Sequence, residues 1–184
     1  MRRLAHFCSI LFGYLLIGLS VVVVIETFGR KLIGFSLQGA DELGGYVLAV
    51  GSTLAFTVAL IERAHIRIDI LRGLPPRTVL AVIDWLSTVL MFCFSALLAW
   101  VCLQVLRETI EYGSVAPSPW GTPLVYPQAL WFLAMVLFLL LALWFAVDAT
   151  LLLLNKRFTE LIRRYGAKDL EEELAEELAD LSRR

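Results

Sequence analysis

The 184-residue sequence has few charged residues and long stretches with none. Only 18% of its residues are charged, 59% belong to the hydrophobic set, and the mean hydropathy is +0.79. Soluble domains are usually about 45–50% apolar. Charges gathered into short blocks between long apolar runs are typical of a polytopic membrane protein. The composition excludes an ordinary soluble domain, and no extended basic face with interleaved aromatics indicates nucleic-acid binding.

Cysteine is also scarce, and its positions exclude a disulfide or zinc framework. The three cysteines, Cys8, Cys93 and Cys102, all lie inside apolar runs. Their number is odd, and their spacing matches no zinc-binding pattern. We interpret them as small apolar packing residues.

Histidines and acidic residues are missing from the centres of the apolar runs. The only histidines, His6 and His65, lie at their edges, whereas haem ligands would lie inside a helical bundle. Ion or proton coupling would need an acid within a span. Asp148 comes nearest to such a position, and we interpret it as an interfacial acid. With no phosphate-binding loop or nucleophile elbow either, the sequence predicts no cofactor and favours neither catalysis nor autonomous transport.

Four apolar segments predict an all-α integral membrane protein, because a spanning helix needs about 20 apolar residues. We expect spans at about 7–25, 43–61, 85–106 and 129–147, within a transmembrane domain over residues 1–155. The first apolar run is longer than a usual signal-peptide core and no cleavage site follows it, so we interpret it as an uncleaved anchor. The third helix can begin as early as Arg77, because no helix breaker follows before its span.

The connections between the spans differ in composition. The glycine-interrupted segment between the first two spans predicts a short amphipathic element on the membrane surface. Pro75 and Pro76 end one element and allow the next helix to begin. The other four prolines lie within residues 107–128, which we expect to be a turn-rich, non-helical loop.

Residues 156–184 are expected to form a tail that is basic at first and then acidic. Its leucines recur at steps of four, four and three, which predicts an acidic amphipathic helix with one apolar face. These leucines are Leu170, Leu174, Leu178 and Leu181. The acidic face disfavours binding to anionic lipid. Two interpretations stay open, a solvated helix end and a helix that docks on a protein.

Lysine and arginine are distributed unevenly over the two sides of the membrane. With a cytoplasmic N-terminus, eleven of them near the spans lie inside and three lie outside. The inner set is Arg2, Arg3, Arg63, Arg67, Arg72, Arg77, Lys156, Arg157, Arg163, Arg164 and Lys168, and the outer set is Arg30, Lys31 and Arg107. Because positive residues favour the cytoplasmic side, both termini are predicted to be cytoplasmic.

The second span has small residues on one face and ionisable residues at both ends. Helical spacing predicts a helix-packing face, used within this chain or with a partner, made of Gly44, Gly51, Ala55 and Ala59. The candidate subunit-interface or anchoring residues are Asp41, Glu42, Glu62, Arg63, His65, Arg67 and Asp69. Acidic residues also suit a helix N-terminus, and arginines also set topology, so local anchoring stays open beside contact with a partner.

Several motifs in order make the chain similar to a known family. They are RKLIGFS at 30–36, ADEL at 40–43, ERAHIRIDIL at 62–71, LPPR at 74–77 and TPLVYPQ at 122–128. With these motifs the sequence resembles the small membrane subunit of tripartite ATP-independent periplasmic (TRAP) transporters, the DctQ-like family. One departure is visible. Many relatives have a tryptophan shortly before the acidic residue that opens the second span, where this chain has Gln38-Gly39.

The resemblance implies a non-enzymatic permease subunit of the bacterial inner membrane that scaffolds a large polytopic membrane subunit. In such systems a periplasmic substrate-binding protein delivers the substrate, often an organic acid. The large subunit then imports it by symport, typically with sodium, and holds the substrate and ion sites. From the residues alone, an independent small homo-oligomeric transporter and a membrane-anchor subunit of another complex, such as a redox enzyme, stay open.

Overall fold

The computed structural model describes residues 2–64, 76–166 and 178, and all structural statements concern these residues. Its elements are α1 (Arg2–Phe28), η1 (Gly29–Ile33), α2 (Ala40–Ile61), α3 (Arg77–Tyr112), α4 (Val125–Leu154) and α5 (Phe158–Tyr165). Four of the helical segments are long and apolar enough to cross a membrane. The prediction of an all-α protein with four spanning helices is confirmed.

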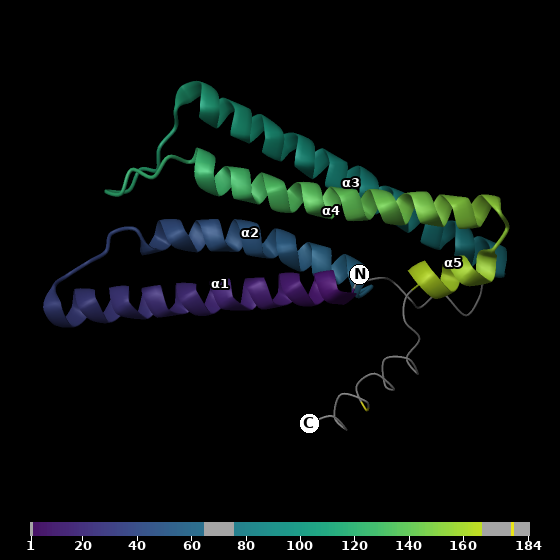
Figure 1. Cartoon of the computed structure of the whole chain (residues 1–184), viewed down its shortest axis with the longest axis horizontal. Coiled ribbons are helices and arrows are strands. Elements are labelled where there is room, and N and C mark those ends of the chain that lie inside the picture. Colours follow the sequence, from purple (N-terminus) through teal and green to yellow (C-terminus); the bar gives the residue numbers. More distant parts are fainter. Residues whose placement is uncertain (1, 65–75, 167–177, 179–184) are drawn as a thin grey trace.

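The four long helices lie side by side in the order α1, α2, α4, α3 (Figure 1). Among the described elements, α1 contacts only α2 and η1, whereas α4 lies between α2 and α3. The helices therefore form an open row instead of a closed bundle. As a result, α1 and α3 are the two edges of the row, and each has a single spanning neighbour.

The helices extend beyond the expected spans, because a charge ends an apolar run without ending a helix. At 1.5 Å per residue, the 36 residues of α3 extend over about 54 Å, against a hydrocarbon core about 30 Å thick. The helix starts at Arg77, as the lack of breakers predicted, and stops at Gly113, whose φ of +58° is left-handed. α4 begins at Val125, so Pro127 lies in its first turn, where no amide N–H is required.

The expectation of a non-helical loop over residues 107–128 is therefore wrong at both ends. Residues 113–124 form the actual connection, which is a small hairpin with an isolated bridge between Val115 and Pro123. The Ala116 N–H donates to the Thr122 carbonyl at 2.9 Å, and a turn closes where the Gly121 N–H donates to the Ser118 carbonyl at 3.0 Å. We call residues 113–124 the α3–α4 hairpin.

The connection between α1 and α2 begins as a continuation of α1. The π-helical turn η1 contains no buried residue and ends at Gly34, whose φ is +71°. Glu26 then fixes the rest of the connection. Its Oε1 accepts a hydrogen bond from Ser36 Oγ, and its Oε2 accepts one from the Leu37 N–H, both at 2.6 Å.

Two apolar clusters hold the row together. The larger one joins α3, α4 and α5 with Leu60 of α2. It includes small residues on both long helices, such as Ala81 and Ala99 on α3 and Ala142 and Ala149 on α4. Small side chains allow helix backbones to approach closely in a membrane. The second cluster joins α1, α2 and α4 through Cys8, Leu54 and Ala134.

Helix α5 lies in the segment that the sequence assigned to the tail. Its apolar side chains recur at i, i+3, i+4 and i+7, and they are Phe158, Leu161, Ile162 and Tyr165. Leu161 and Tyr165 are buried, and α5 packs against α3 and α4 (Figure 1). The boundary at residue 156 stays a prediction, and the predicted acidic helix lies outside the described residues except for Leu178.

Candidate subunit-interface sites

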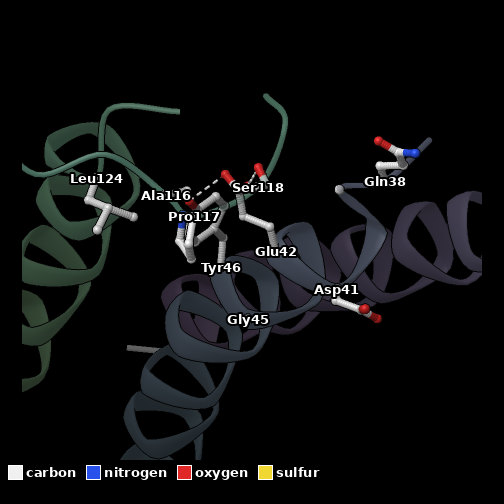
Figure 2. A pocket seen from close by; sticks show the side chains of 10 residues that line it. Gln38, Asp41, Glu42, Gly45, Tyr46, Ala116, Pro117, Ser118 and Leu124 are labelled. Atoms are coloured by element: carbon white, nitrogen blue, oxygen red, sulfur yellow. Dashed lines mark hydrogen bonds between the residues drawn. The ribbon is translucent and has the colours of Figure 1, made fainter. Parts of the chain in front are cut away.

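The N-terminal end of α2 is joined to the α3–α4 hairpin through Glu42. Tyr46 Oη, one helical turn further on, donates to Glu42 Oε1 at 2.6 Å. The Ser118 hydroxyl of the hairpin donates to Glu42 Oε2, as Figure 2 shows. Both oxygens of this candidate residue are therefore engaged inside the chain, where they hold the hairpin over α2.

A second contact at this end involves Trp120 at the tip of the hairpin. Its indole ring lies against Gly39, where an added Cβ would be 2.5 Å from Trp120 Cδ2. Only glycine leaves room for the ring in this position. The indole next to the acidic residues that open α2 thus comes from Trp120 of the hairpin. At the start of α2 itself, the sequence departs from the family pattern with Gln38-Gly39.

A pocket of about 500 Å³ opens between the start of α2 and the hairpin. Its lining comprises Gln38, Gly39, Asp41, Glu42, Gly45, Tyr46, Ala116, Pro117, Ser118 and Leu124. Asp41 is exposed and points away from the contact between Glu42 and Ser118 (Figure 2). The two neighbouring acids therefore differ, because Glu42 is held within the chain and Asp41 faces outward.

The opposite end of α2 is joined to α5 through Arg63. Its guanidinium Nη1 donates to the Arg163 carbonyl at 2.8 Å and to the Gly166 carbonyl at 3.5 Å. A cation at the end of α5 also suits the partial negative charge of a helix C-terminus. Arg63 has a φ of +58°, and the Ala64 N–H donates to the Ala59 carbonyl, as in a Schellman helix end.

Of the remaining candidates at this end, the structure describes only Glu62. Glu62 is exposed where α2 ends. His65, Arg67 and Asp69 lie outside the described residues. For these three, a role at an interface stays a prediction.

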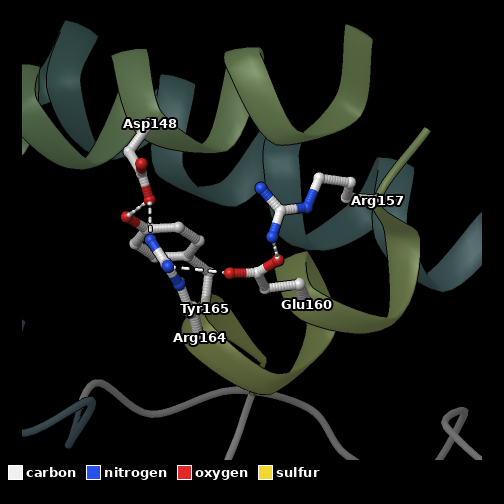
Figure 3. Close-up of polar contacts among 5 residues, drawn as sticks. All are labelled: Asp148, Arg157, Glu160, Arg164 and Tyr165. Atoms are coloured by element: carbon white, nitrogen blue, oxygen red, sulfur yellow. Dashed lines mark hydrogen bonds and ion pairs between the residues drawn. The ribbon is translucent and has the colours of Figure 1, made fainter. Parts of the chain in front are cut away.

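Asp148 is the centre of a polar cluster that holds α5 against α4 (Figure 3). Its Oδ2 accepts hydrogen bonds from Tyr165 Oη at 2.6 Å and from Arg164 Nη1 at 3.0 Å. Glu160 pairs with Arg164 at 2.7 Å and also with Arg157. The hydrogen bond to Asp148 raises the pKa of Arg164, and burial followed by the same acceptor raises the pKa of Tyr165.

Trp85 adds a contact between α3 and α4 at the same end. Its indole N–H donates to Thr150 Oγ1 at 2.9 Å, and the Thr150 hydroxyl donates to the Ala146 carbonyl at 2.6 Å. Asp84, which the sequence placed just before the third span, lies about two turns into α3 and is buried.

The predicted packing face of α2 is placed mainly towards α1. A Cβ at Gly51 would be 2.3 Å from Phe12 Cε2, and one at Gly44 would be 4.0 Å from Leu19 Cδ1. Ala55 and Ala59 are partly buried. Gly44 and Gly51 of this face therefore lie towards the first helix.

Several residues that make these contacts were not among the candidates predicted from the sequence. Tyr165 and Arg164 belong to α5, whose apolar spacing was a usable signal that the basic residues around it concealed. Ser118 and Trp120 carried no such signal, because a hairpin tip has no periodicity that relates it to a distant helix.

Four membrane-length helices in an open row, with polar contacts at both ends, define a polytopic helical membrane protein. The model of the family described as "Tripartite ATP-independent periplasmic transporters, DctQ component" matches residues 19–152, and the chain belongs to this family. It is accordingly a small permease subunit of a TRAP transporter and a multi-pass protein of the bacterial inner membrane. Comparison with curated proteins and with solved structures gave no significant match.

Proposed function

We propose that this chain is a non-catalytic scaffold that widens the fixed membrane frame of the large transport subunit. The family implies association with that subunit and with a binding protein. The observation that carries the proposal is the open row, since only 6% of the most apolar 18-residue stretch of α1 is buried. An edge helix with so little cover suits a subunit that adds helices to a larger protein.

The transport step is proposed to belong to the large subunit. A periplasmic binding protein would deliver an organic acid, and the large subunit would import it with sodium. In this scheme the small subunit supplies no substrate or ion ligand. Its task is mechanical, because a moving transport domain needs a frame that stays fixed in the bilayer.

The orientation we propose places α5 in the cytoplasm and the α3–α4 hairpin in the periplasm. α5 contributes two arginines, and its N-cap Arg157 a third, to the end of the row that also holds Arg63 and Arg77. This distribution follows the preference of positive residues for the cytoplasmic side. A membrane-impermeant thiol reagent on intact cells should label Ser114→Cys, whereas Thr159→Cys should react only after permeabilisation. The reverse result would overturn the orientation.

The candidate residues are proposed to divide into two groups. Glu42 and Arg63 act within the chain, since each binds a distant segment of it. Asp41 and Glu62 are exposed and lie at opposite ends of α2, so we propose them as contacts for the partner subunits. His65, Arg67 and Asp69 stay candidates for the same role. Charge reversal at Asp41 should weaken the assembly while leaving the isolated chain folded.

Co-purification tests the proposal directly. A tagged chain, co-expressed with a suitable large subunit and extracted in mild detergent, should retain that subunit. Recovery of only this chain, alone or with itself, would overturn the scaffold role. An independent transporter would instead give flux in liposomes containing this chain alone, and Asp148→Asn would abolish that flux.

A further inference from the structure

Helix α1 presents one side to α2 and leaves its other sides free among the described elements. The α2-facing side follows alternating steps of three and four residues, and it comprises Ala5, Cys8, Phe12, Leu15, Leu19, Val22 and Glu26. Phe12 lies against Gly51, and Cys8 packs with Leu54. This side is therefore already occupied inside the chain.

A second stripe on α1 has the same heptad spacing and is exposed along its whole length. It comprises Phe7, Leu11, Tyr14, Gly18, Val21, Ile25 and Phe28, which we call the α1 outer seam. Steps of four and three residues are those of helices that pack with a left-handed crossing of about 20°. The seam thus has the spacing that a second helix requires.

Tyr14 places a hydroxyl group of the seam deep in the membrane. Residue 51 lies near the middle of the uncharged part of α2, and Phe12 lies at its level. Tyr14 is two residues from Phe12, which is about 3 Å along the helix axis, whereas the hydrocarbon core extends about 15 Å to either side. The hydroxyl therefore lies well inside the hydrocarbon.

Hydrocarbon offers no acceptor to this hydroxyl. Tyr14 is 71% exposed, and no acceptor for its hydroxyl is found among the described residues. A phenol in an apolar environment normally donates a hydrogen bond. The most direct source of an acceptor at this depth is a carbonyl or polar side chain of another spanning helix.

Gly18 lies one turn from Tyr14 on the same seam. A Cβ at this position would meet no atom within 4 Å, so the chain itself does not require a glycine there. Small residues allow two helix backbones to approach closely in lipid. A glycine in the middle of the seam therefore marks the point where a partner helix can come nearest.

The third side of α1 has features that suit lipid. It comprises Ile10, Gly13, Ile17, Ser20, Val24 and Thr27. Ser20 and Thr27 donate to the carbonyls of Leu16 and Val23 at 2.8 and 2.7 Å, so their hydroxyls are satisfied within the helix. This side needs no partner for these two groups, in contrast to the seam with Tyr14.

We propose that a spanning helix of the large membrane subunit packs on the α1 outer seam. This partner helix comes nearest to α1 at Gly18 and supplies the acceptor for the hydrogen bond that Tyr14 donates. The inference rests on the proposed function, because it takes the large subunit as the occupant. α1 is also the least covered of the four spanning helices, with 6% of its apolar stretch buried against 17–33% for the others.

Two glycine variants test the seam with a matched control. Gly18→Leu fills the crossing point, whereas Gly13→Leu makes the same change on the lipid-facing side, where a Cβ also meets nothing within 4 Å. Gly18→Leu should lower recovery of the large subunit about tenfold in co-purification. Gly13→Leu should leave it near the wild-type level, and both variants should stay monodisperse. Equal recovery with both variants would overturn the proposal.

Photo-crosslinking identifies the occupant. A benzophenone amino acid at position 14 should crosslink to the large subunit, whereas the same group at position 20 should not. Crosslinks from position 14 to a second copy of this chain, or to lipid only, would overturn the proposal while the scaffold role stands. If wild-type protein fails to recover the large subunit at all, the proposed function fails first, and the two failures are thus distinguishable.

Discussion

The indole ring of Trp120 lies so close to Gly39 that a single added carbon at residue 39 would be 2.5 Å from Cδ2 and 2.6 Å from Cε2. This contact joins the tip of the α3–α4 hairpin to the residue just before α2. Together with the bond between Ser118 and Glu42, it holds the hairpin over the start of α2, a segment 76 residues earlier in the sequence.

Gly39→Ala should therefore destabilise the protein. The φ of Gly39 is −145°, which alanine also adopts, so the penalty comes from the collision with the indole ring. We expect a loss of about 1–3 kcal/mol, typical of overpacking, seen as a lower melting temperature in detergent. Gly45→Ala is the control, because its Cβ would meet nothing within 4 Å. Equal melting of both variants would contradict the contact.

Gly51→Ala should weaken the packing of α1 on α2. Its Cβ would be 2.3 Å from the ring of Phe12, whereas a Cβ at Gly44 would be 4.0 Å from Leu19. We expect Gly51→Ala to lower stability by about 1–3 kcal/mol and Gly44→Ala to have little effect. The double variant Phe12→Ala/Gly51→Ala should lose less than the sum of its single changes, because neighbouring sites are not additive. Additive losses would argue against the contact.

Two substitutions at Arg63 should separate the contribution of its side chain to stability from the cost of its backbone conformation. Both Arg63→Ala and Arg63→Gly remove the bonds to the end of α5, so both should increase hydrogen exchange over residues 158–165. At the left-handed φ of +58°, alanine still has the steric cost of a Cβ, whereas glycine does not. Arg63→Gly should therefore be more stable than Arg63→Ala by about 1 kcal/mol, and the opposite order would refute this account.

Tyr165→Phe should loosen α5 by removing the hydrogen bond to Asp148. A bond to a charged acceptor typically contributes about 1.5–3 kcal/mol, and increased hydrogen exchange in α5 should report its loss. Thr159→Ala changes an exposed residue of the same helix and should have little effect.

The same variant gives a pH dependence. Burial and the bond to Asp148 raise the pKa of Tyr165 above its unfolded value of about 10, so the folded state keeps the phenol protonated. A group whose pKa is raised on folding stabilises the folded state fully while the pH is below its unfolded pKa. This stabilisation is lost as the pH rises above that value. The stability difference between wild type and Tyr165→Phe should stay constant between about pH 7 and pH 9 and shrink above about pH 10. If this stability difference already changed below pH 9, the result would contradict the proposed effect of Tyr165.

The apolar runs were sufficient to predict four spanning helices, but they did not locate the helix ends. The charged residues Arg107, Glu108 and Glu111 leave the apolar run while still continuing α3, because only Gly113 breaks the backbone pattern. In the same way, Pro127 fits into the first turn of α4 instead of delaying its start. Polarity decides where a helix leaves lipid, and backbone chemistry decides where it stops.

For the candidate residues, chemical type and position along the chain can be read from the sequence, whereas their partners cannot. Asp41 and Glu42 are adjacent and look equivalent, yet only Glu42 is held by Tyr46 and Ser118. Arg63 reads as a topology signal, while its guanidinium binds the end of a helix about 100 residues further along. Such contacts depend on which helices are neighbours, and no local pattern encodes that.

By itself, the sequence determined that this protein is a membrane protein with four spans and a member of a transporter subunit family. Apolar runs longer than a bilayer is thick can be buried only in lipid, and that constraint acts on each segment separately. The tertiary structure alone decided the order α1, α2, α4, α3, the docking of α5 and the exposure of the α1 outer seam. These features depend on close packing between distant residues, such as Gly51 with Phe12 and Gly39 with Trp120, where the shape of one side chain selects the position of another.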